Sequence, residues 1–342
     1  MRFFIIAILC DELKEEGNIM IYAYFLKKFV PMNEAKVSIM THAFNYGTGI
    51  FEGIKGYYNE EKDQIFVFRL HKHYERMISN CKILKMYLEN SVEELADITC
   101  KLIEMNNYEC DVYIRPIAYK SLEKVGVRLP EEHDLCIYTV PMDLYFKSDN
   151  PLKVCISSWK RIDDNAIPGR GKICGSYVNS ALAAQEARDN GFDEAIFLND
   201  DGHVSEGPGM NLFMIKNGVL RTPPVTHNIL EGITRESIIE IASEELGIST
   251  FPRAIDRSEL YQAEELFFCG TAAEIAPIGS VDHRPIGNGE IGKVTKELRS
   301  LFFRIVRGNY EKYSKWLTEV YPRKGMQEDE KRNELTKVEI VK

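Results

Sequence analysis

The chain has 342 residues, a length that favours about two domains. Its 44% hydrophobic and 28% charged residues are typical of a globular protein. The net charge of −9 gives no general attraction for nucleic acid or for anionic membranes, so any anion-binding site must be local. Eight scattered cysteines without a C-x-x-C pair argue against a metal site and favour reduced thiols in the cytoplasm.

The first residues of the chain imitate a short signal sequence, because residues 3–9 are apolar and follow Arg2. The run is shorter than the roughly 20 residues that span a membrane. Mostly acidic residues follow at 11–16, where a signal sequence would need a small-residue cleavage site. We therefore expect residues 1–19 to be an extension before the fold, with Met20 as the natural start.

In the first half of the chain, apolar residues recur with the period of two that is typical of strands or with the helical period of 3.6. The predicted strands cover residues 21–30, 64–69, 112–119 and 135–140. The predicted helices cover residues 72–89 and 91–106. The polar stretch between Pro141 and Pro151 is the best candidate for a linker.

The second half is richer in strands. They are predicted over residues 152–157, 194–198, 203–205, 212–215, 219–221 and 266–269. The dipeptide Asn217-Gly218 predicts a tight hairpin between two of them. Helices are predicted over 177–188, 234–246 and 293–307, with Thr234 as the N-cap of the second and Gly247 as its stop.

Two segments carry the chemistry. Lys172 stands among glycines in residues 169–177, and a lysine in such a tight setting can lose its proton and form an imine with a carbonyl. Glu206 stands among glycines in residues 205–213, and a buried carboxylate can hold a proton on a heteroaromatic nitrogen. Together they indicate pyridoxal 5′-phosphate (PLP), whose ring needs both partners. Taken alone, Lys172 is weak evidence, because most lysines are solvated surface charges. The tripeptide around Glu206 is, taken alone, as compatible with the end of an exposed hairpin.

Two further segments are candidate anion sites. Residues 232–235 open a helix, where free amides and the helix dipole favour a phosphate. Residues 270–274 follow a strand and offer amides in a turn. Each is equally compatible with a structural role, as a simple helix cap and as an ordinary strand-to-helix corner. A phosphate-binding P-loop around Lys172 is excluded, because Ala166 and Ile173 occupy places that the motif reserves for Gly and for Ser or Thr.

Taken together, these segments resemble the branched-chain-amino-acid aminotransferases within the class IV, or fold type IV, PLP enzymes. The resemblance runs from about Ile21 to Tyr321. It rests on seven blocks in the same order, which are residues 41–53, 73–76, 113–116, 169–177, 205–213, 230–235 and 270–275.

The resemblance implies a cofactor site. Lys172 would bind PLP as an imine and carry a proton between the substrate Cα and the cofactor C4′. Glu206 would keep the pyridine nitrogen protonated, and Tyr177 would bind the phenolic oxygen. The residues implied for the phosphate and the rest of the cofactor are Arg76, Ile233, Thr234, Thr271 and Asn211.

It also implies a substrate site. Tyr113 and the amides of Thr271 and Ala272 would bind the α-carboxylate, and Arg115 the distal carboxylate of glutamate. The walls of the pocket would be formed by Tyr46, Phe51, Gly53 and Tyr145, and Val127 would reach the site of a neighbouring subunit. Pro208, Met210, Ile173, Cys174 and Met142 depart from the residues usual in the family, and bear on the shape of the pocket.

The implied fold is α+β with two domains. A small α/β domain would cover residues 20–142, a linker 143–150, a larger strand-rich pseudo-barrel domain 151–321 and a charged tail 322–342. The implied function is transamination of L-leucine, L-isoleucine and L-valine with 2-oxoglutarate by an oligomer that is at least a homodimer. We expect no nucleic-acid or membrane partner and no metal.

Two alternatives remain within this fold, and a third, from a different functional class, is a relative without turnover. A D-amino acid aminotransferase would carry an Arg-x-His pair, which residues 113–117 lack. An aminodeoxychorismate lyase would carry a strand rich in glycine and arginine, which is not seen. A PLP-binding relative without turnover is disfavoured by the retention of Lys172, Glu206, Tyr177 and Arg76.

Overall fold

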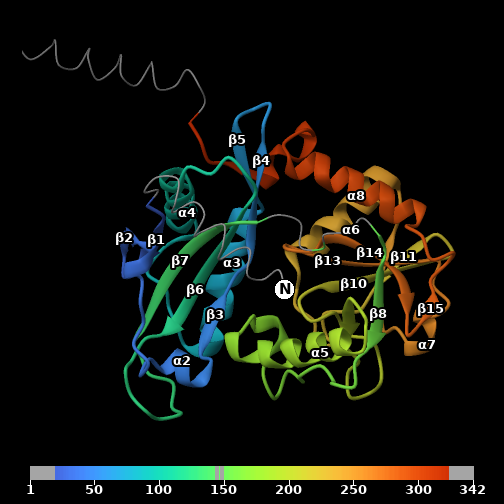
Figure 1. Ribbon diagram of the computed structural model, residues 1–342, viewed down its shortest axis with the longest axis horizontal. Helices are drawn as coiled ribbons and strands as arrows, with labels where there is room; N and C mark the ends of the chain where they lie inside the picture. The colour runs from blue at the N-terminus through green and yellow to red at the C-terminus, as the bar shows by residue number, and fades with distance from the viewer. Residues whose placement is uncertain (1–19, 143–145, 147–149, 323–342) are drawn as a thin grey trace, which may run out of the picture.

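The computed structural model describes residues 20–142, 146 and 150–322. Within these residues, strands form two eight-stranded sheets that lie side by side, each with helices packed on it (Figure 1). This is the α+β arrangement expected from the sequence. Most of the predicted linker lies outside the described residues, as do the predicted extension and nearly all of the tail. The division into domains therefore stays a prediction.

The first sheet is antiparallel throughout. Its order is β16-β5-β4-β6-β7-β1-β2, and β3 also pairs with β6. The strands are β1 (Tyr22–Phe25), β2 (Lys28–Pro31), β3 (Gly49–Phe51), β4 (Ile54–Asn59), β5 (Gln64–Phe68), β6 (Val112–Lys120), β7 (His133–Pro141) and β16 (Leu317–Glu319). The predicted strand over 21–30 is thus two strands, because Leu26 and Lys27 adopt left-handed conformations that turn the chain into a hairpin.

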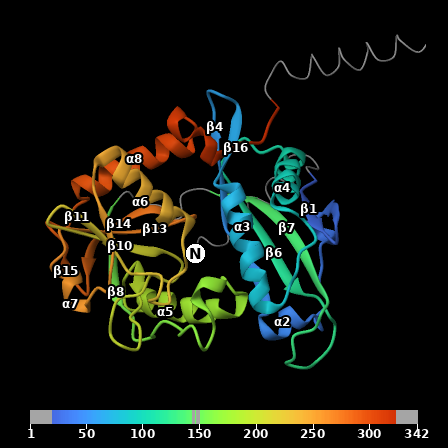
Figure 2. The ribbon, with the colours of Figure 1, turned by 180° about the vertical axis from the view of Figure 1, so that it is seen from behind.

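Helices α3 (Leu70–Cys81) and α4 (Val92–Asn106) pack on this sheet (Figure 2), while α2 (His42–Tyr46) and the short helix η1 (Met32–Glu34) lie in connections. Leu70, Tyr74, Met77 and Cys81 recur at helical spacing and are buried. The predicted helix over 72–89 was too long, because after η2 (Lys82–Leu84) the left-handed conformation of Lys85 ends it. Helix α4 begins at Val92, one residue later than predicted, because Ser91 is its N-cap and forms a capping box with Glu94.

The second sheet is mixed, and its order is β12-β11-β10-β13-β14-β8-β9, with β15 paired to β14. Its strands are β8 (Leu152–Ile156), β9 (Glu194–Ile196), β10 (Asn211–Lys216), β11 (Val219–Thr222), β12 (Thr250–Pro252), β13 (Glu265–Gly270), β14 (Glu274–Val281) and β15 (Arg284–Pro285). The hairpin predicted at Asn217-Gly218 joins β10 to β11. Residues 203–205 form only isolated bridges, so the strand predicted there is wrong.

The helices of this half are α5 (Tyr177–Asp189), α6 (Ile233–Leu246), α7 (Arg257–Leu260) and α8 (Lys293–Val306), with the short helices η3 (Gly169–Gly171), η4 (Cys174–Ser176) and η5 (Glu311–Trp316). Gly247 ends α6 in a left-handed conformation, as predicted. Its N-cap is Gly232 rather than Thr234, so the helix begins one residue earlier than expected.

The two halves meet through aromatic packing and a returning strand. The ring of Phe302 on α8 lies 5.5 Å from that of Phe68 on β5, centroid to centroid. Beyond α8, the chain passes along the edge of the molecule (Figure 1), and β16 pairs with β5 of the first sheet. This return fixes the two sheets beside each other. Across the described residues, no helix combines the length and the apolar composition that a membrane crossing requires.

Candidate active site

Lys172 lies directly after η3, in a left-handed backbone conformation with a φ of +46°. The turn before it is close packed, since a Cβ at Gly169 would lie 2.5 Å from a neighbouring backbone carbonyl oxygen. Strand β3 of the first sheet holds the segment, because the Phe51 amide donates to the Lys172 carbonyl at 3.2 Å. The side-chain amine, Nζ, donates to Tyr177 Oη at 3.0 Å. Such strained positions are often found at functional sites.

Glu206 is buried, with 4% of its surface exposed. Its Oε1 lies 2.8 Å from the guanidinium of Arg161, and its Oε2 accepts from Asn211 Nδ2 at 2.9 Å and from the Leu230 amide at 3.1 Å. Burial raises the pKa of Glu206 to about 6, although Arg161 opposes the rise. The carboxylate is therefore held in one orientation and can share a proton with a basic nitrogen near neutral pH.

This raised pKa predicts how the stability of the cofactor-free protein depends on pH. The folded state binds a proton at Glu206 with a pKa of about 6 against 4.5 for the ordinary group, so it holds more protons than the unfolded state between these values. The extra proton adds to the free energy of unfolding below pH 4.5, and this contribution is lost as the pH rises through about 6. The free energy of unfolding should therefore fall by about 2 kcal/mol across this window. Urea unfolding across this window should show the loss in the wild type and not in Glu206→Gln. Equal pH dependence in both proteins would contradict it.

Arg161 is a site residue that the sequence analysis missed. Besides its ion pair with Glu206, its Nε donates to the carbonyl oxygen of Asn228 at 3.1 Å, and its guanidinium lies 5.7 Å from the ring centroid of Phe197. Arginine after a strand is common, and nothing in the local sequence pairs it with a distant carboxylate. Only the tertiary structure identifies it.

The start of helix α6 is joined to Glu206 by Asn211. The Asn211 amide donates to Glu206 and to the Leu230 carbonyl, both at 2.9 Å. A Cβ at Gly232 would lie 2.0 Å from Asn211 Oδ1, so only glycine fits at this N-cap. The first amides of the 14-residue helix, at Ile233 and Thr234, line the cavity described below. A helix N-terminus of this kind favours an anion.

Arg76 reaches the same place from α3. Its Nη1 donates to the Glu231 carbonyl at 2.8 Å, and its Nε and Nη2 donate to Glu52 at 2.8 and 2.7 Å. Burial alone would raise the pKa of Glu52, but Arg76 and His73 hold it well below its usual value. Three of the five N–H donors of Arg76 are thus used among the described residues, which leaves two for a ligand. The sequence analysis assigned no role to Glu52.

Tyr113 and Arg115 come from β6. Arg115 Nη2 donates to Tyr113 Oη at 2.6 Å, and its guanidinium lies 4.3 Å from the ring centroid of Phe51. A Cβ at Gly53 would lie 2.4 Å from Tyr113 Oη, so the glycine leaves room for this hydroxyl. Within the described residues, the buried Nε of Arg115 has no hydrogen-bond partner. A buried donor without a partner is costly unless a ligand or water binds it.

The turn between β13 and β14 faces these residues. Thr271 and Ala272 line the cavity, and no hydrogen bond to their amides is found among the residues that the structure describes. Successive free amides in a turn form a seat for an anion. This supports the interpretation of the turn as an anion site.

These segments surround one cavity of about 450 Å³. It brings together almost all of the predicted site, namely Phe51, Gly53, Arg76, Tyr113, Arg115, Lys172, Tyr177, Glu206, Asn211, Ile233, Thr234, Thr271 and Ala272. Pro208 and Met210, two of the departures from the family, line it as well.

Two predicted residues lie elsewhere on this chain. Tyr46 does not line the cavity, and its hydroxyl accepts a hydrogen bond from the Gly126 amide at 3.0 Å. The neighbouring Val127 is 82% exposed. The fold therefore places Tyr46 beside the loop of Val127 rather than beside Lys172. Tyr145 lies outside the described residues.

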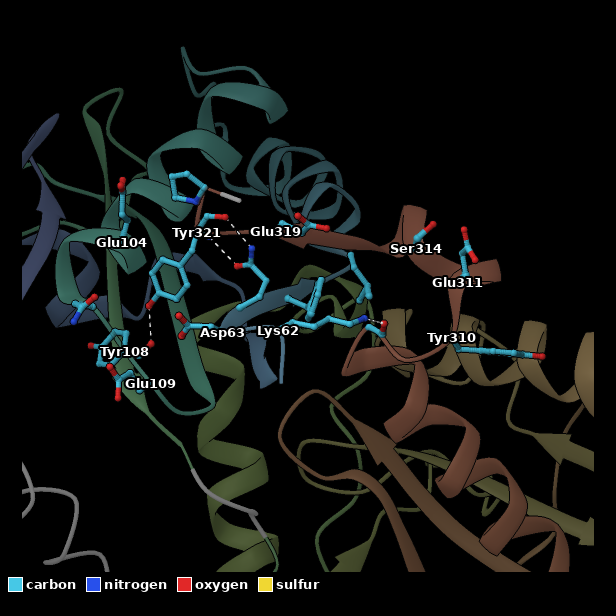
Figure 3. Close-up of a pocket in the computed structure, with 16 residues that line it drawn as sticks. Lys62, Asp63, Glu104, Tyr108, Glu109, Tyr310, Glu311, Ser314, Glu319 and Tyr321 are labelled. Atoms are coloured by element: carbon cyan, nitrogen blue, oxygen red, sulfur yellow. Dashed lines mark hydrogen bonds between the residues drawn. The ribbon is translucent and has the colours of Figure 1, made fainter. Parts of the chain in front are cut away.

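A larger hollow of about 1220 Å³ lies away from Lys172, between the β4–β5 turn, the end of α4 and η5 (Figure 3). Glu104, Glu109 and Glu311 stand around it, together with Lys62 and Tyr321 (Figure 3). None of the cofactor or substrate residues predicted from the sequence lines it. The smaller cavity is the candidate active site, because it holds the reactive amine, the buried carboxyl and both anion seats.

Comparison with known proteins identifies the family. The model of the class IV aminotransferases matches residues 49–281. A probable branched-chain-amino-acid aminotransferase of Aquifex aeolicus is 48% identical over 301 residues, which cover 88% of this chain and 97% of that protein. The chain belongs to the branched-chain-amino-acid aminotransferases of class IV.

Solved structures agree with the sequence relatives. The branched-chain aminotransferase of Thermoproteus uzoniensis, solved with norvaline, has a TM-score of 0.84 at 40% identity and covers 88% of this chain and 100% of its own. The enzyme of Thermobaculum terrenum in its PLP form has a TM-score of 0.83 at 38% identity. The match covers 90% of this chain and 100% of that enzyme. The predicted fold type IV architecture and the assignment as an enzyme, an aminotransferase, are thereby confirmed.

Proposed function

We propose that this aminotransferase binds PLP and transfers the amino group of L-leucine, L-isoleucine and L-valine to 2-oxoglutarate, giving 2-oxo acids and L-glutamate. The observation that carries the proposal is the shared cavity, in which Lys172 Nζ, the buried Glu206 and the start of α6 all face one volume of about 450 Å³. A related structure in its PLP form supports the choice of cofactor.

Three features of the chain fit PLP. The start of α6 lines the cavity at Ile233 and Thr234, and two N–H donors of Arg76 remain for a phosphate. Glu206, with a pKa of about 6, can share a proton with the pyridine nitrogen of the cofactor near neutral pH. Lys172 would hold the aldehyde carbon, with Tyr177 at the phenolic oxygen, and Thr271 would complete the phosphate site.

When bound, PLP supplies an electron sink for the pair released from the substrate Cα. Lys172 Nζ takes the proton from Cα, and Tyr177 Oη, 3.0 Å away, orients this amine. Glu206 holds a proton on the ring nitrogen, and Arg161 and Asn211 fix its carboxylate for that purpose. Tyr113 and the Thr271–Ala272 amides hold the α-carboxylate.

One pocket must accept aliphatic and acidic side chains in turn. Phe51 gives an apolar wall, and norvaline in the Thermoproteus uzoniensis structure is an aliphatic ligand of the same kind. The free Nε of Arg115 gives a local donor for the distal carboxylate of glutamate. The Phe51 ring against the guanidinium shields this charge from the aliphatic substrate.

Purified protein tests the proposal. Addition of L-leucine should shift the visible absorption of the bound cofactor and, with 2-oxoglutarate, yield glutamate. A panel with L-isoleucine, L-valine and D-alanine separates the alternatives. A response to D-alanine and none to L-leucine would instead favour a D-amino acid aminotransferase.

We also propose that the enzyme is at least a homodimer in the cytoplasm. Ile39, Phe44, Val125 and Val127 are exposed apolar side chains near the loop that Tyr46 supports, and such a surface is typical of an interface. Tyr46 and Val127 would complete the partner's pocket. All seven described cysteines are free, which supports a reducing compartment.

Val127→Asp should lower kcat/KM about tenfold, because it places a carboxylate against an apolar pocket. Phe251→Asp, on β12, changes a similarly exposed apolar residue in the second sheet and should have little effect. Mixing Val127→Asp subunits with Lys172→Ala subunits should restore activity. In the mixed dimer, the site of the Val127→Asp subunit keeps its lysine and receives an intact Val127 loop from the Lys172→Ala subunit. Full activity of Val127→Asp alone would contradict a role across the interface.

A further inference from the structure

A buried ion pair joins the two sheets beside the candidate active site. Lys55 on β4 is 1% exposed, and its Nζ donates to Glu274 Oε1 of β14 at 2.8 Å. Glu274 is 4% exposed, and its carboxylate also interacts with the buried Tyr57. Asp111 Oδ2 lies 3.7 Å from Lys55 Nζ and binds Arg307 at the end of α8. Neither Lys55 nor Glu274 lines the cavity.

The backbone of Glu274 is strained. Its φ is +57°, a left-handed conformation that ends the turn between β13 and β14. Glycine or asparagine is usual at this position of a hairpin, and other residues pay about 1–2 kcal/mol. A glutamate there therefore needs a compensating contact, and the contact it makes is the ion pair with Lys55.

The Lys55–Glu274 pair connects the two parts of the proposed α-carboxylate receptor, which are Tyr113 and the amides of the Thr271–Ala272 turn. Glu274 lies two residues after Ala272, where the turn enters β14. Lys55 pairs in register with Tyr113 on the neighbouring strand, so Tyr113 is carried by the first sheet and the turn by the second. A change in the distance between Lys55 and Glu274 would change the distance between Tyr113 and the turn amides.

We propose that Lys55 and Glu274 are positioning residues whose ion pair sets the spacing of the α-carboxylate receptor. The pair thereby determines the enzyme's affinity for the carboxylate that all its amino-acid and 2-oxo-acid substrates share. This inference rests on the proposed function, which assigns Tyr113 and the turn to that carboxylate. A buried ion pair is often no more stabilising than apolar residues, so fixed geometry explains its presence better than stability does.

The test is the double variant Lys55→Met/Glu274→Gly. It leaves no buried charge unpaired, and glycine accepts the positive φ, so the protein should fold. A small fall in unfolding temperature is expected, because the buried Tyr57 hydroxyl loses its partner Glu274. Arg69→Met/Glu240→Gln removes a second ion pair between the two halves, at 3.0 Å, and is the matched control.

The probe is 4-methylvalerate, which has the leucine skeleton and carboxylate but no amine. Calorimetry on the cofactor-loaded proteins should show its Kd raised about tenfold in the double variant and little changed in the control. KM for L-leucine should rise with it, while the single-turnover rate with 3-methylbutylamine, which lacks the carboxylate, should stay within about twofold.

An unchanged Kd in the double variant would overturn the inference, and so would an equal rise in the control, since that would show general cohesion of the two halves. The Kd measurement needs no turnover. Failure of the wild type to transaminate L-leucine would therefore refute the proposed function separately from the positioning role.

Discussion

Lys172→Ala is expected to abolish transamination, with a fall in kcat of at least about 10⁴-fold. The amine holds the cofactor and moves the Cα proton, and no other described lysine lines the cavity. Production of glutamate from L-leucine and 2-oxoglutarate measures the loss. Borohydride reduction followed by peptide mapping should label residue 172 in the wild type and no residue in the variant.

Lys160→Ala is the matched control, because Lys160 lies in the same half of the chain with a 58% exposed side chain. It should keep full activity. Substantial turnover by Lys172→Ala, or a borohydride label on another lysine of the wild type, would overturn the role assigned to Lys172.

Glu206→Gln should lower kcat about 10²- to 10³-fold, the usual cost of losing one fixed electrostatic partner of a reacting group. Glutamine keeps the shape but cannot stabilise a proton on the ring nitrogen. Stopped-flow measurement of the reaction with L-leucine should locate the loss in the proton-transfer step. The affinity for the cofactor should change less, because the phosphate seat of Arg76 and α6 is intact.

Glu194→Gln tests whether any buried carboxyl in the cavity would serve. Burial raises the pKa of Glu194 to about 7, so this group is partly neutral already at neutral pH. The variant should lose far less activity than Glu206→Gln. Equal losses would show that the effect comes from the buried carboxyls as a class and not from the position of Glu206.

The site also explains how an acidic protein binds anionic molecules. The net charge of −9 is offset locally, since Arg76, Arg115, Arg161 and Lys172 line the cavity, together with the start of α6. Two of these arginines are neutralised by fixed carboxylates, Arg76 by Glu52 and Arg161 by Glu206. The positive charge that a ligand meets therefore depends on which cationic side chains of the cavity lack a carboxylate partner, and not on the net charge of the chain.

The sequence by itself determined the elements whose signals are local. The span of α4 was predicted to within one residue from its helical periodicity, and the β10–β11 turn follows from Asn217-Gly218. Lys172 and Glu206 were singled out from the sequence because each stands among glycines, and the structure brings both to one cavity.

Only the tertiary structure decided the elements and contacts that depend on distant partners. Strands β4 and β14 were not predicted, because Gly56 in β4 and Pro277 and Gly279 in β14 are residue types that weaken a strand signal. Lys55 with Glu274, and Arg161 with Glu206, are paired by folding across long stretches of chain. Tyr46 was placed at the Val127 loop by a hydrogen bond to Gly126. In each case the energy comes from burial and pairing between segments that no local pattern connects.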